Sequence, residues 1–231
     1  MTTRDNKHIA IIGASYAGLA LANGLLNKKD NNKVTLFEGR HPLPVGSIVG
    51  NVTIISQHVL KELGMPFRAS ERIPEAELFE LLRQPVQQSI NYGHVVQGLH
   101  QAPDGRIVLT VRQHDSVEEL GPYDFVVAAN GVWSKFRASN LQQVAVIGDA
   151  RWAQDSWDFG LQRIRGGANQ ALEDGLDLGR LLCGQLQDLG KFSARFKQLQ
   201  VRRRRALWAA FWCAAIAVVL RRTLFESQTM A

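Results

Sequence analysis

A glycine-rich stretch near the N-terminus has the residue types and spacing that suit a phosphate ligand. The segment IAIIGASYAGLALA contains the pattern G-x-S-x-x-G, formed by Gly13, Ser15 and Gly18. The first glycine lets the chain leave a strand sharply, the middle position lets backbone N–H groups and a Ser hydroxyl reach a pyrophosphate, and the last glycine allows close helix packing. The helix N-terminus would then face the phosphates with its positive dipole end. The pattern predicts a dinucleotide-binding turn made of Gly13, Ser15, Tyr16, Ala17 and Gly18.

An acidic residue at the end of the next apolar run fits the same ligand. Glu38 follows the run Val34–Phe37, where a carboxylate can accept hydrogen bonds from a ribose hydroxyl and would repel a 2′-phosphate. The residues Glu38, Gly39 and Arg40 are therefore predicted to lie beside the ribose of an adenosine of the FAD or NAD type, not the NADP type. A solvated carboxylate at a strand end, without a ligand, is the alternative interpretation.

The segment GASYA also partly matches the G-x-S-x-G turn of serine hydrolases, in the same strand-turn-helix setting. A hydrolase would need a histidine and an acid later in the chain. None of the six histidines has an obvious position after a strand that would supply this. The dinucleotide interpretation is therefore preferred.

Two further apolar runs end in turns of small and polar residues. Phe125–Ala128 leads into Asn130 and Gly131, and Val144–Ile147 leads into Gly148 and Asp149. Both runs are typical of buried strands whose ends can contact a ligand. A segment with helical spacing, GGANQALEDGLDLGRLL, follows the second turn.

These turns together resemble those of the FAD-dependent aromatic hydroxylases, the single-component flavoprotein monooxygenases of the para-hydroxybenzoate hydroxylase type. The resemblance covers about residues 7–188. It implies that Asp149, after Gly148, binds the flavin ribityl chain, and that the helix start at Gly167, Ala168 and Asn169 presents N–H groups to the flavin pyrimidine. It also implies FAD as cofactor, NAD(P)H as transient reductant, and oxygen activation toward a small, aromatic-like substrate, with the catalytic residues unassigned. Asn130 and Gly131 complete the implied cofactor site.

The chain departs from this family at several positions. Asn130 stands where the family has Asp, Ala128 where it usually has Gly, and Glu75 where it often has Arg. A long segment of the family's substrate domain is missing, because only residues 138–143 separate the second motif from the third. A second hypothesis therefore stays open: a truncated or degenerate FAD-fold protein without catalysis, acting as a membrane-associated interaction module. A plain NAD dehydrogenase is disfavoured, since it would not need the second and third turns.

The hydrophobic pattern predicts an α/β fold. It is a Rossmann-like FAD/NAD(P)-binding domain with a central parallel sheet, a small antiparallel β-meander and C-terminal helices. Strands are expected at 8–12, 34–37, 92–99, 106–113, 123–128 and 144–147. Helices are expected at 15–26, 53–63, 74–88 (with Pro85 as a point where the helix could end), 169–186 and 191–220, with Asp174 facing solvent. The FAD-binding domain would span residues 1–188, and residues 189–231 would form a C-terminal basic and apolar part.

The C-terminal part combines an arginine run with an apolar stretch. Residues 206–220 are flanked by Arg202–Arg205 and by Arg221–Arg222, and as a helix they would span about 22 Å, less than a hydrocarbon core of about 30 Å. Three interpretations compete: a core helix packed on the FAD domain, association with a membrane surface through 206–220, and a true span. We expect a cytoplasmic protein, associated with a membrane if the second holds.

Charge and cysteine content exclude other classes of function. The 27 basic and 21 acidic residues give a net charge of +6, and much of the excess belongs to the arginine run. Together with the lack of a basic-aromatic or zinc-finger pattern, this predicts no nucleic-acid partner. The two cysteines, Cys183 and Cys213, lack partners at metal-site spacing, so we expect reduced thiols and no metal.

Overall fold

The computed structural model describes residues 6–26, 32–41, 52–54, 57–64, 72–131, 134–141, 143–147, 167–185 and 198. The chain divides into two units, Met1–Leu189 and Gly190–Ala231, and every helix and strand discussed below belongs to the first. Apart from residue 198, the expected helix at 191–220 lies outside the described residues, and so does the apolar stretch 206–220.

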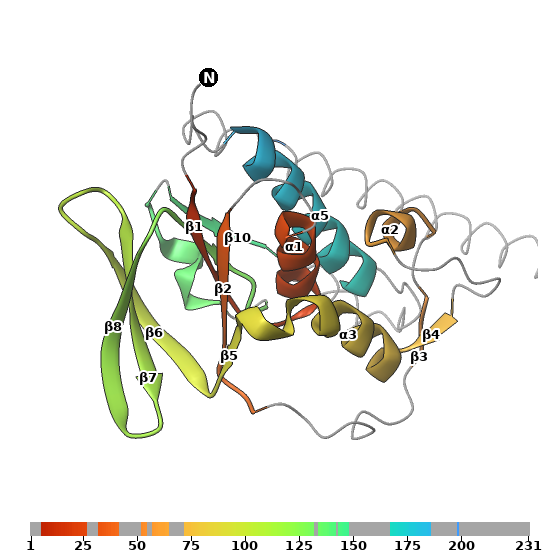
Figure 1. Cartoon of the computed structure of the whole chain (residues 1–231), viewed down its shortest axis with the longest axis horizontal. Helices are drawn as coiled ribbons and strands as arrows, with labels where there is room; N and C mark the ends of the chain where they lie inside the picture. The colour runs from red at the N-terminus through yellow and green to blue at the C-terminus, as the bar shows by residue number, and fades with distance from the viewer. Residues whose placement is uncertain are drawn as a thin grey trace, which may run out of the picture. The chain divides into compact units, whose positions relative to one another are not determined.

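The centre of the first unit is a parallel sheet of five strands in the order β10-β9-β1-β2-β5 (Figure 1). The strands are β1 (His8–Ile12), β2 (Lys33–Glu38), β5 (Ile90–Tyr92), β9 (Phe125–Ala128) and β10 (Val144–Val146). In the register, Ile12 pairs with Phe37 on one side and with Ala128 on the other. Continuous apolar runs form these strands because both faces of a central parallel sheet are covered. The expected central parallel sheet is therefore confirmed.

Helices cover one side of the sheet. α1 (Tyr16–Leu26) connects β1 to β2, and α5 (Gly167–Gln185) packs along α1, as Figure 1 shows. α3 (Glu75–Arg83) is fastened to α1 by the amide of Asn23, which is 5% exposed and donates to the carbonyls of Leu19 (2.8 Å) and Leu82 (2.7 Å). The expectation for Asp174 was wrong: it is 7% exposed, because α5 packs so closely on α1.

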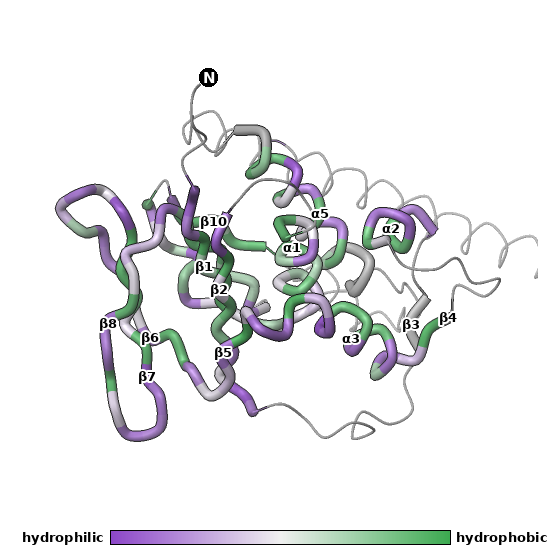
Figure 2. The backbone as a smooth tube through the Cα atoms, in the orientation of Figure 1, coloured by the Kyte–Doolittle hydropathy of each residue, from purple (hydrophilic) through white to green (hydrophobic). Residues whose placement is uncertain are grey.

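A small antiparallel sheet covers the other side. It contains β6 (His94–Gln101), β7 (Ile107–Gln113) and β8 (Ser116–Tyr123) in the order β6-β7-β8. Its core side chains meet those of the central strands in one buried cluster: Ala10, Ile12, Phe37, Val96, Ile107, Leu109, Val111, Tyr123, Val126, Ala128 and Phe136. In Figure 2 the ends of this meander are hydrophilic, whereas hydrophobic stretches lie between them. The predicted meander is confirmed.

Several boundaries differ from the expected ones. The segment expected to be one helix at 53–63 contains β3 (Val52–Ile54), paired with β4 (Arg72–Pro74), before α2 (Gln57–Glu62). α3 ends at Arg83 and a 3₁₀ helix (Gln84–Ser89) follows, as Pro85 would favour. A turn at Gly93, with φ of +72°, divides the expected strand at 92–99 between β5 and β6.

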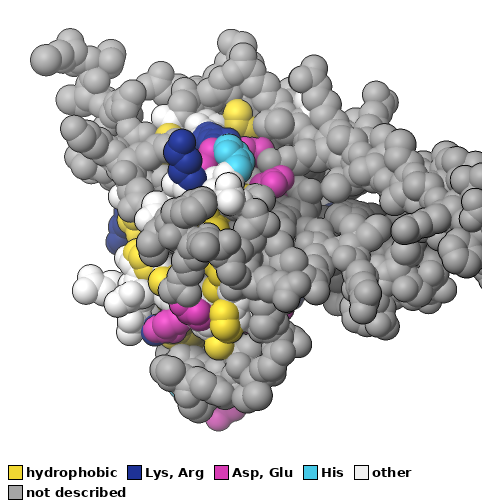
Figure 3. Space-filling view, turned by 90° about the vertical axis from the view of Figure 1, so that its right-hand side faces the viewer, with side chains coloured by type: hydrophobic (Ala, Val, Ile, Leu, Met, Phe, Trp, Pro, Cys, Tyr) yellow, Lys and Arg dark blue, Asp and Glu magenta, His cyan; other side chains and the backbone are white. Residues whose placement is uncertain are grey.

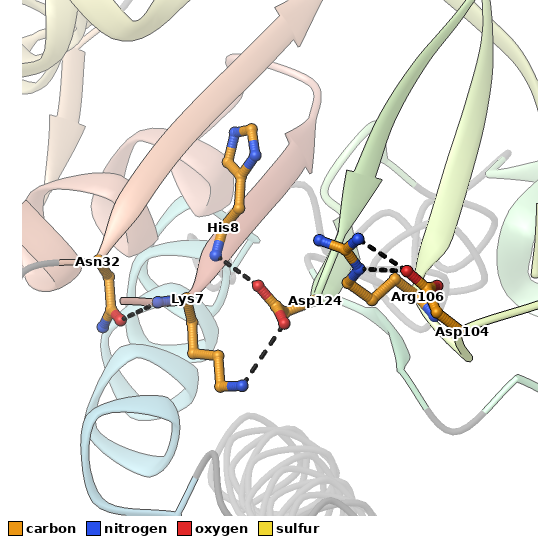
Figure 4. Close-up of polar contacts among 6 residues, drawn as sticks. All are labelled: Lys7, His8, Asn32, Asp104, Arg106 and Asp124. Carbon is orange, nitrogen blue, oxygen red and sulfur yellow. Dashed lines mark hydrogen bonds and ion pairs between the residues drawn. The ribbon is translucent and has the colours of Figure 1, made fainter. Parts of the chain in front are cut away.

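The expected strand at 123–128 is also divided, at Asp124. The Asp124 carboxylate accepts a hydrogen bond from the backbone N–H of His8 (2.8 Å) and pairs with the amine of Lys7 (3.5 Å), as Figure 4 shows. The same figure shows the hydrogen bonds of Lys7 with Asn32 and of Arg106 with Asp104. The residues before this point form β8 (Ser116–Tyr123), of which only Tyr123 lies in an expected strand. Asp124 thus joins β1 to the chain between β8 and β9, at the edge where β1 begins.

Candidate functional site

The turn between β1 and α1 is built so closely against β9 that side chains would not fit. Gly13 has a φ of +104°, and a Cβ there would lie 2.8 Å from the carbonyl oxygen of Ala129. A Cβ on Gly18 would lie 2.1 Å from the Gly13 oxygen. Both glycines are therefore required by the backbone. The sharp exit from the strand and the close helix packing that the sequence indicated are present.

Ser15 joins this turn to the end of β9. Its hydroxyl donates to the carbonyl of Ala129 over 2.6 Å and accepts from the backbone N–H of Gly18 over 3.3 Å. A nucleophilic serine is activated by donating to a base such as histidine. Because this hydroxyl donates to a backbone carbonyl, the geometry does not favour a serine hydrolase.

Glu38 fastens the turn from the other side. One carboxylate oxygen accepts from the N–H of Ala14 (2.9 Å) and the other accepts from the N–H of Arg40 (3.0 Å). An ionised carboxylate has about four acceptor positions, so both oxygens retain capacity for a ligand hydroxyl. Glu38, Gly39 and Arg40 thus lie directly beside the β1–α1 turn.

The first turn of α1 presents three backbone donors. The N–H groups of Gly13 and Leu19 bond to backbone carbonyls, and those of Ala14 and Gly18 bond to the side chains of Glu38 and Ser15. The N–H groups of the three residues between them, Ser15–Ala17, have no acceptor in the described part of the chain. Unpaired N–H groups at a helix N-terminus, together with the helix dipole, favour an anion.

Tyr16 supplies one of these three N–H groups, and its side chain packs against α3. Its ring packs edge-on against Phe79 of α3, with 6.4 Å between the ring centroids. Burial raises the pKa of Tyr16 to about 12, and the negative charge of Glu75 adds to the increase. The phenol is therefore neutral at physiological pH, and the Glu75 carboxylate acts electrostatically on the start of α1.

The ends of the neighbouring strands lie at the same edge of the sheet. Ala129 N–H donates to the Ile12 carbonyl (2.8 Å), and Ile147 N–H donates to the Ala128 carbonyl (2.9 Å). Asn130 is exposed there, and Gly131 has a φ of +88° with no atom within 4 Å of an added Cβ. Gly148 and Asp149, which follow Ile147 directly, lie outside the described residues.

Helix α5 brings its N-terminus to this edge. A Cβ on Gly175 would lie 2.4 Å from the Ala17 oxygen, and one on Gly179 would lie 3.6 Å from a methyl carbon of Leu21. Later residues of α5 therefore meet later residues of α1, so the two helices run in the same direction. At about 1.5 Å per residue, Gly167 precedes Gly175 by roughly 12 Å along the axis. The start of α5 thus projects beyond the first turn of α1, toward the edge where β1 and β9 end.

Gly167, Ala168 and Asn169 form that first turn of α5. The structure describes their helical backbone but not their side chains. It therefore places two helix N-termini, those of α1 and α5, at the carboxyl edge of the parallel strands. This is the region in which ligands bind in open α/β sheets.

Charged groups also join α5 to α2, away from this edge. Glu62 pairs with Arg180 and with His58 (3.2 Å to the His58 nitrogen), and Arg180 also pairs with Asp177 (3.0 Å). On the face that Figure 3 shows, side chains of Lys or Arg, His, and Asp or Glu lie together. In the described ranges, no cluster of His, Cys, Asp and Glu could hold a metal ion.

Comparisons with known proteins give a structural likeness only. No protein-family model and no curated protein matches the chain. The structure of CtdE in complex with FAD aligns with a TM-score of 0.62 and 13% identity, over 86% of this chain and 90% of that one. The chain therefore shares the Rossmann-like fold of that FAD-bound protein. The predicted fold class is thereby confirmed, whereas membership of the aromatic-hydroxylase family stays a prediction.

Two other similar structures are flavoproteins of greater length. One is described as an FAD-containing monooxygenase from Photorhabdus luminescens subsp. laumondii, with a TM-score of 0.46 and 25% identity over 59% of this chain. The other is CmlS, a flavin-dependent halogenase, with a TM-score of 0.46 and 16% identity over 58% of this chain. This chain spans 42% and 31% of their respective lengths.

Among the helices that the structure describes, none is both long and apolar enough to cross a membrane.

Proposed function

We propose that the chain binds FAD as the cofactor of an oxidoreductase of the flavoprotein monooxygenase type. NAD(P)H would be the transient reductant, and the substrate would be a small, aromatic-like molecule. The observation that carries the proposal is the set of three N–H groups, Ser15–Ala17, without acceptors in the described part of the chain, at the sheet edge where two helices begin. A dinucleotide pyrophosphate is the group that such a site accommodates best.

The residues present fit this cofactor. Gly13 and Gly18 let the β1–α1 turn pack directly against backbone atoms of Ala129 and of Gly13 itself, which holds the N–H groups of Ser15–Ala17 at the start of α1. Glu38 has acceptor capacity for a ribose hydroxyl, with Gly39 and Arg40 beside it. This arrangement supports an adenosine end bound near β2 and a pyrophosphate bound at α1.

The flavin end would be bound at the other turns. The turns that would bind it are Asn130 and Gly131 after β9, and Gly148 and Asp149 after β10. The backbone N–H groups of Gly167–Asn169, in the first turn of α5, would face the flavin ring. FAD would supply hydride acceptance and oxygen activation, and the protein would supply orientation and electrostatics. The helix N-terminus would stabilise negative charge on the flavin ring.

A specific observation supports a second candidate, an FAD-fold protein without substrate turnover. A 3₁₀ helix (Lys135–Ala138) follows the β9 turn, and the N–H of Val144 at the start of β10 donates to the Leu141 carbonyl over 3.2 Å. This short connection leaves no room for a substrate domain at that point of the chain. Exclusion of water from the reduced cofactor would then need some other segment or partner.

The two candidates are separated by spectra and kinetics of the purified chain. Flavin absorbance that remains after desalting, nearly stoichiometric with protein, supports FAD binding. Consumption of NADH or NADPH that increases with an aromatic compound, with formation of the hydroxylated product, supports the monooxygenase. Bound FAD without such consumption supports the second candidate, and absence of FAD binding contradicts the first candidate while it fits a degenerate, cofactor-free form of the second. Co-sedimentation with anionic vesicles tests whether the chain associates with a membrane surface through residues 206–220.

A further inference from the structure

The Ser15 hydroxyl has a role different from the one the sequence suggested. A serine hydroxyl has one proton to donate, and here Ala129 receives it at 2.6 Å. The acceptor belongs to a residue that is 1% exposed. If the hydroxyl turned toward a phosphate, this buried carbonyl would lose its donor, and an unsatisfied buried acceptor is costly.

The same oxygen is also the N-cap of α1. It accepts from the N–H of Gly18, three residues on, which is the usual geometry of a capping serine. The side chain is therefore engaged on both sides within the protein. It connects two segments that are 114 residues apart in the sequence.

We propose that Ser15 is a positioning residue, whose hydroxyl holds the first turn of α1 and the turn Ala129–Gly131 in a fixed relation around one dinucleotide. The proposal rests on the proposed function. The phosphates are bound by the backbone N–H groups of Ser15–Ala17, and the hydroxyl aligns those donors with the β9 turn. Asn130 and Gly131 directly follow the carbonyl that Ser15 holds, so loss of this contact displaces both turns from a common ligand.

The test uses the full chain with Ser15→Ala, Ser15→Gly and Ser15→Thr. Ser116→Ala is the matched control, because the Ser116 hydroxyl also donates to a backbone carbonyl, that of Gln113 at 2.9 Å, but in the exposed β7–β8 turn. Three quantities are measured: the midpoint of thermal unfolding without cofactor, hydrogen exchange of the Gly18 amide, and the FAD dissociation constant well below each midpoint.

Positioning by Ser15 predicts changes in all three quantities. Ser15→Ala and Ser15→Gly lower the unfolding midpoint of the cofactor-free protein by about 2–4 °C, speed exchange at Gly18, and weaken FAD binding about three- to tenfold. Ser15→Thr keeps the hydroxyl and restores all three. Ser116→Ala changes neither Gly18 exchange nor FAD binding.

Two results overturn the positioning role. If Ser15→Ala weakens FAD binding while the cofactor-free midpoint and Gly18 exchange stay unchanged, the hydroxyl binds the ligand directly. If the midpoint and exchange change but FAD binding does not, the contact is structural only. Failure of the unmodified chain to bind FAD is a distinct result: it contradicts the proposed function, and the positioning role toward FAD with it.

Discussion

The Glu38 carboxylate accepts a hydrogen bond from the backbone N–H of Ala14, with 2.9 Å between the oxygen and the nitrogen. This contact joins the end of β2 to the turn that follows β1. The second carboxylate oxygen accepts from Arg40 N–H at 3.0 Å, so one side chain fixes two backbone turns. A residue that the sequence assigned to a ligand therefore also organises the site itself.

Replacement of Glu38 by Ala is expected to reduce both stability and FAD affinity. Hydrogen bonds to charged groups contribute about 1.5–3 kcal/mol, and partial exposure places the loss in unfolding free energy near the lower value. Glu119→Ala in β8, where the side chain is 64% exposed, is the control and should change stability by less than about 0.5 kcal/mol. Urea denaturation measures both variants, and equal stability of the two would contradict the structural role of Glu38.

Substitution by Ala should change the unfolding free energy in opposite directions at two glycines of α1. Gly18→Ala places a Cβ 2.1 Å from a backbone oxygen, whereas Gly24→Ala meets no atom within 4 Å. The first change is expected to cost about 1–3 kcal/mol or more and to weaken FAD binding. The second should be neutral or stabilise by up to about 1 kcal/mol, because Ala favours helix. Urea denaturation and FAD titration are measured for both variants. Equal losses for Gly18→Ala and Gly24→Ala would contradict the close backbone approach at Gly18.

Glu75 should oppose the binding of a pyrophosphate. Its charge contributes to the raised pKa of Tyr16, whose N–H is one of the three donors at the start of α1. Glu75→Gln is therefore expected to tighten FAD binding about two- to fivefold at low salt, corresponding to roughly 0.4–1 kcal/mol, and salt should reduce the difference. Glu77→Gln, two positions further along α3 and so on another face, is the control. Unchanged affinity of Glu75→Gln at low salt would refute this electrostatic effect.

The stability of the fold should decrease on acidification through His8. Burial and the charge of Lys33 lower the pKa of His8, and the charge of Asp124 offsets part of this decrease. The His8 ring lies 4.5 Å from that of Tyr123, and its Nε2 is 3.0 Å from the Thr35 hydroxyl. The unfolded chain then binds the proton more tightly, so stability decreases as the pH falls below about 6.5 toward the folded-state pKa. His8→Gln should have a flatter dependence of unfolding free energy on pH. An identical profile for the variant would exclude His8 as the cause.

Local patterns made much of the fold predictable. The β1–α1–β2 unit, strands β6 and β7 of the meander and the start of α5 follow from apolar periodicity and from turns that depend on a few adjacent residues. β8 was missed because it contains Glu118, Glu119, Gly121 and Pro122, so that its strand conformation depends on pairing with β7 rather than on its own composition.

The site was predictable in its backbone but not in its side-chain contacts. The positions of Gly13, Gly18 and Glu38 could be inferred from spacing, because the turn geometry limits which residues fit. The contact of Ser15 with Ala129 spans 114 residues of sequence and depends on the tertiary structure. The burial of Asp174 depends similarly on how α5 packs along α1.

FAD binding at the β1–α1 turn can be measured by titrating the purified full chain with FAD, followed by flavin fluorescence, and by repeating the titration with riboflavin. Riboflavin lacks the pyrophosphate and adenosine that the Ser15–Ala17 N–H groups and Glu38 are proposed to bind. We expect saturable binding of one FAD per chain, and binding of riboflavin that is weaker by a factor of at least ten. Absence of saturable FAD binding, or riboflavin binding as tight as that of FAD, would contradict this expectation.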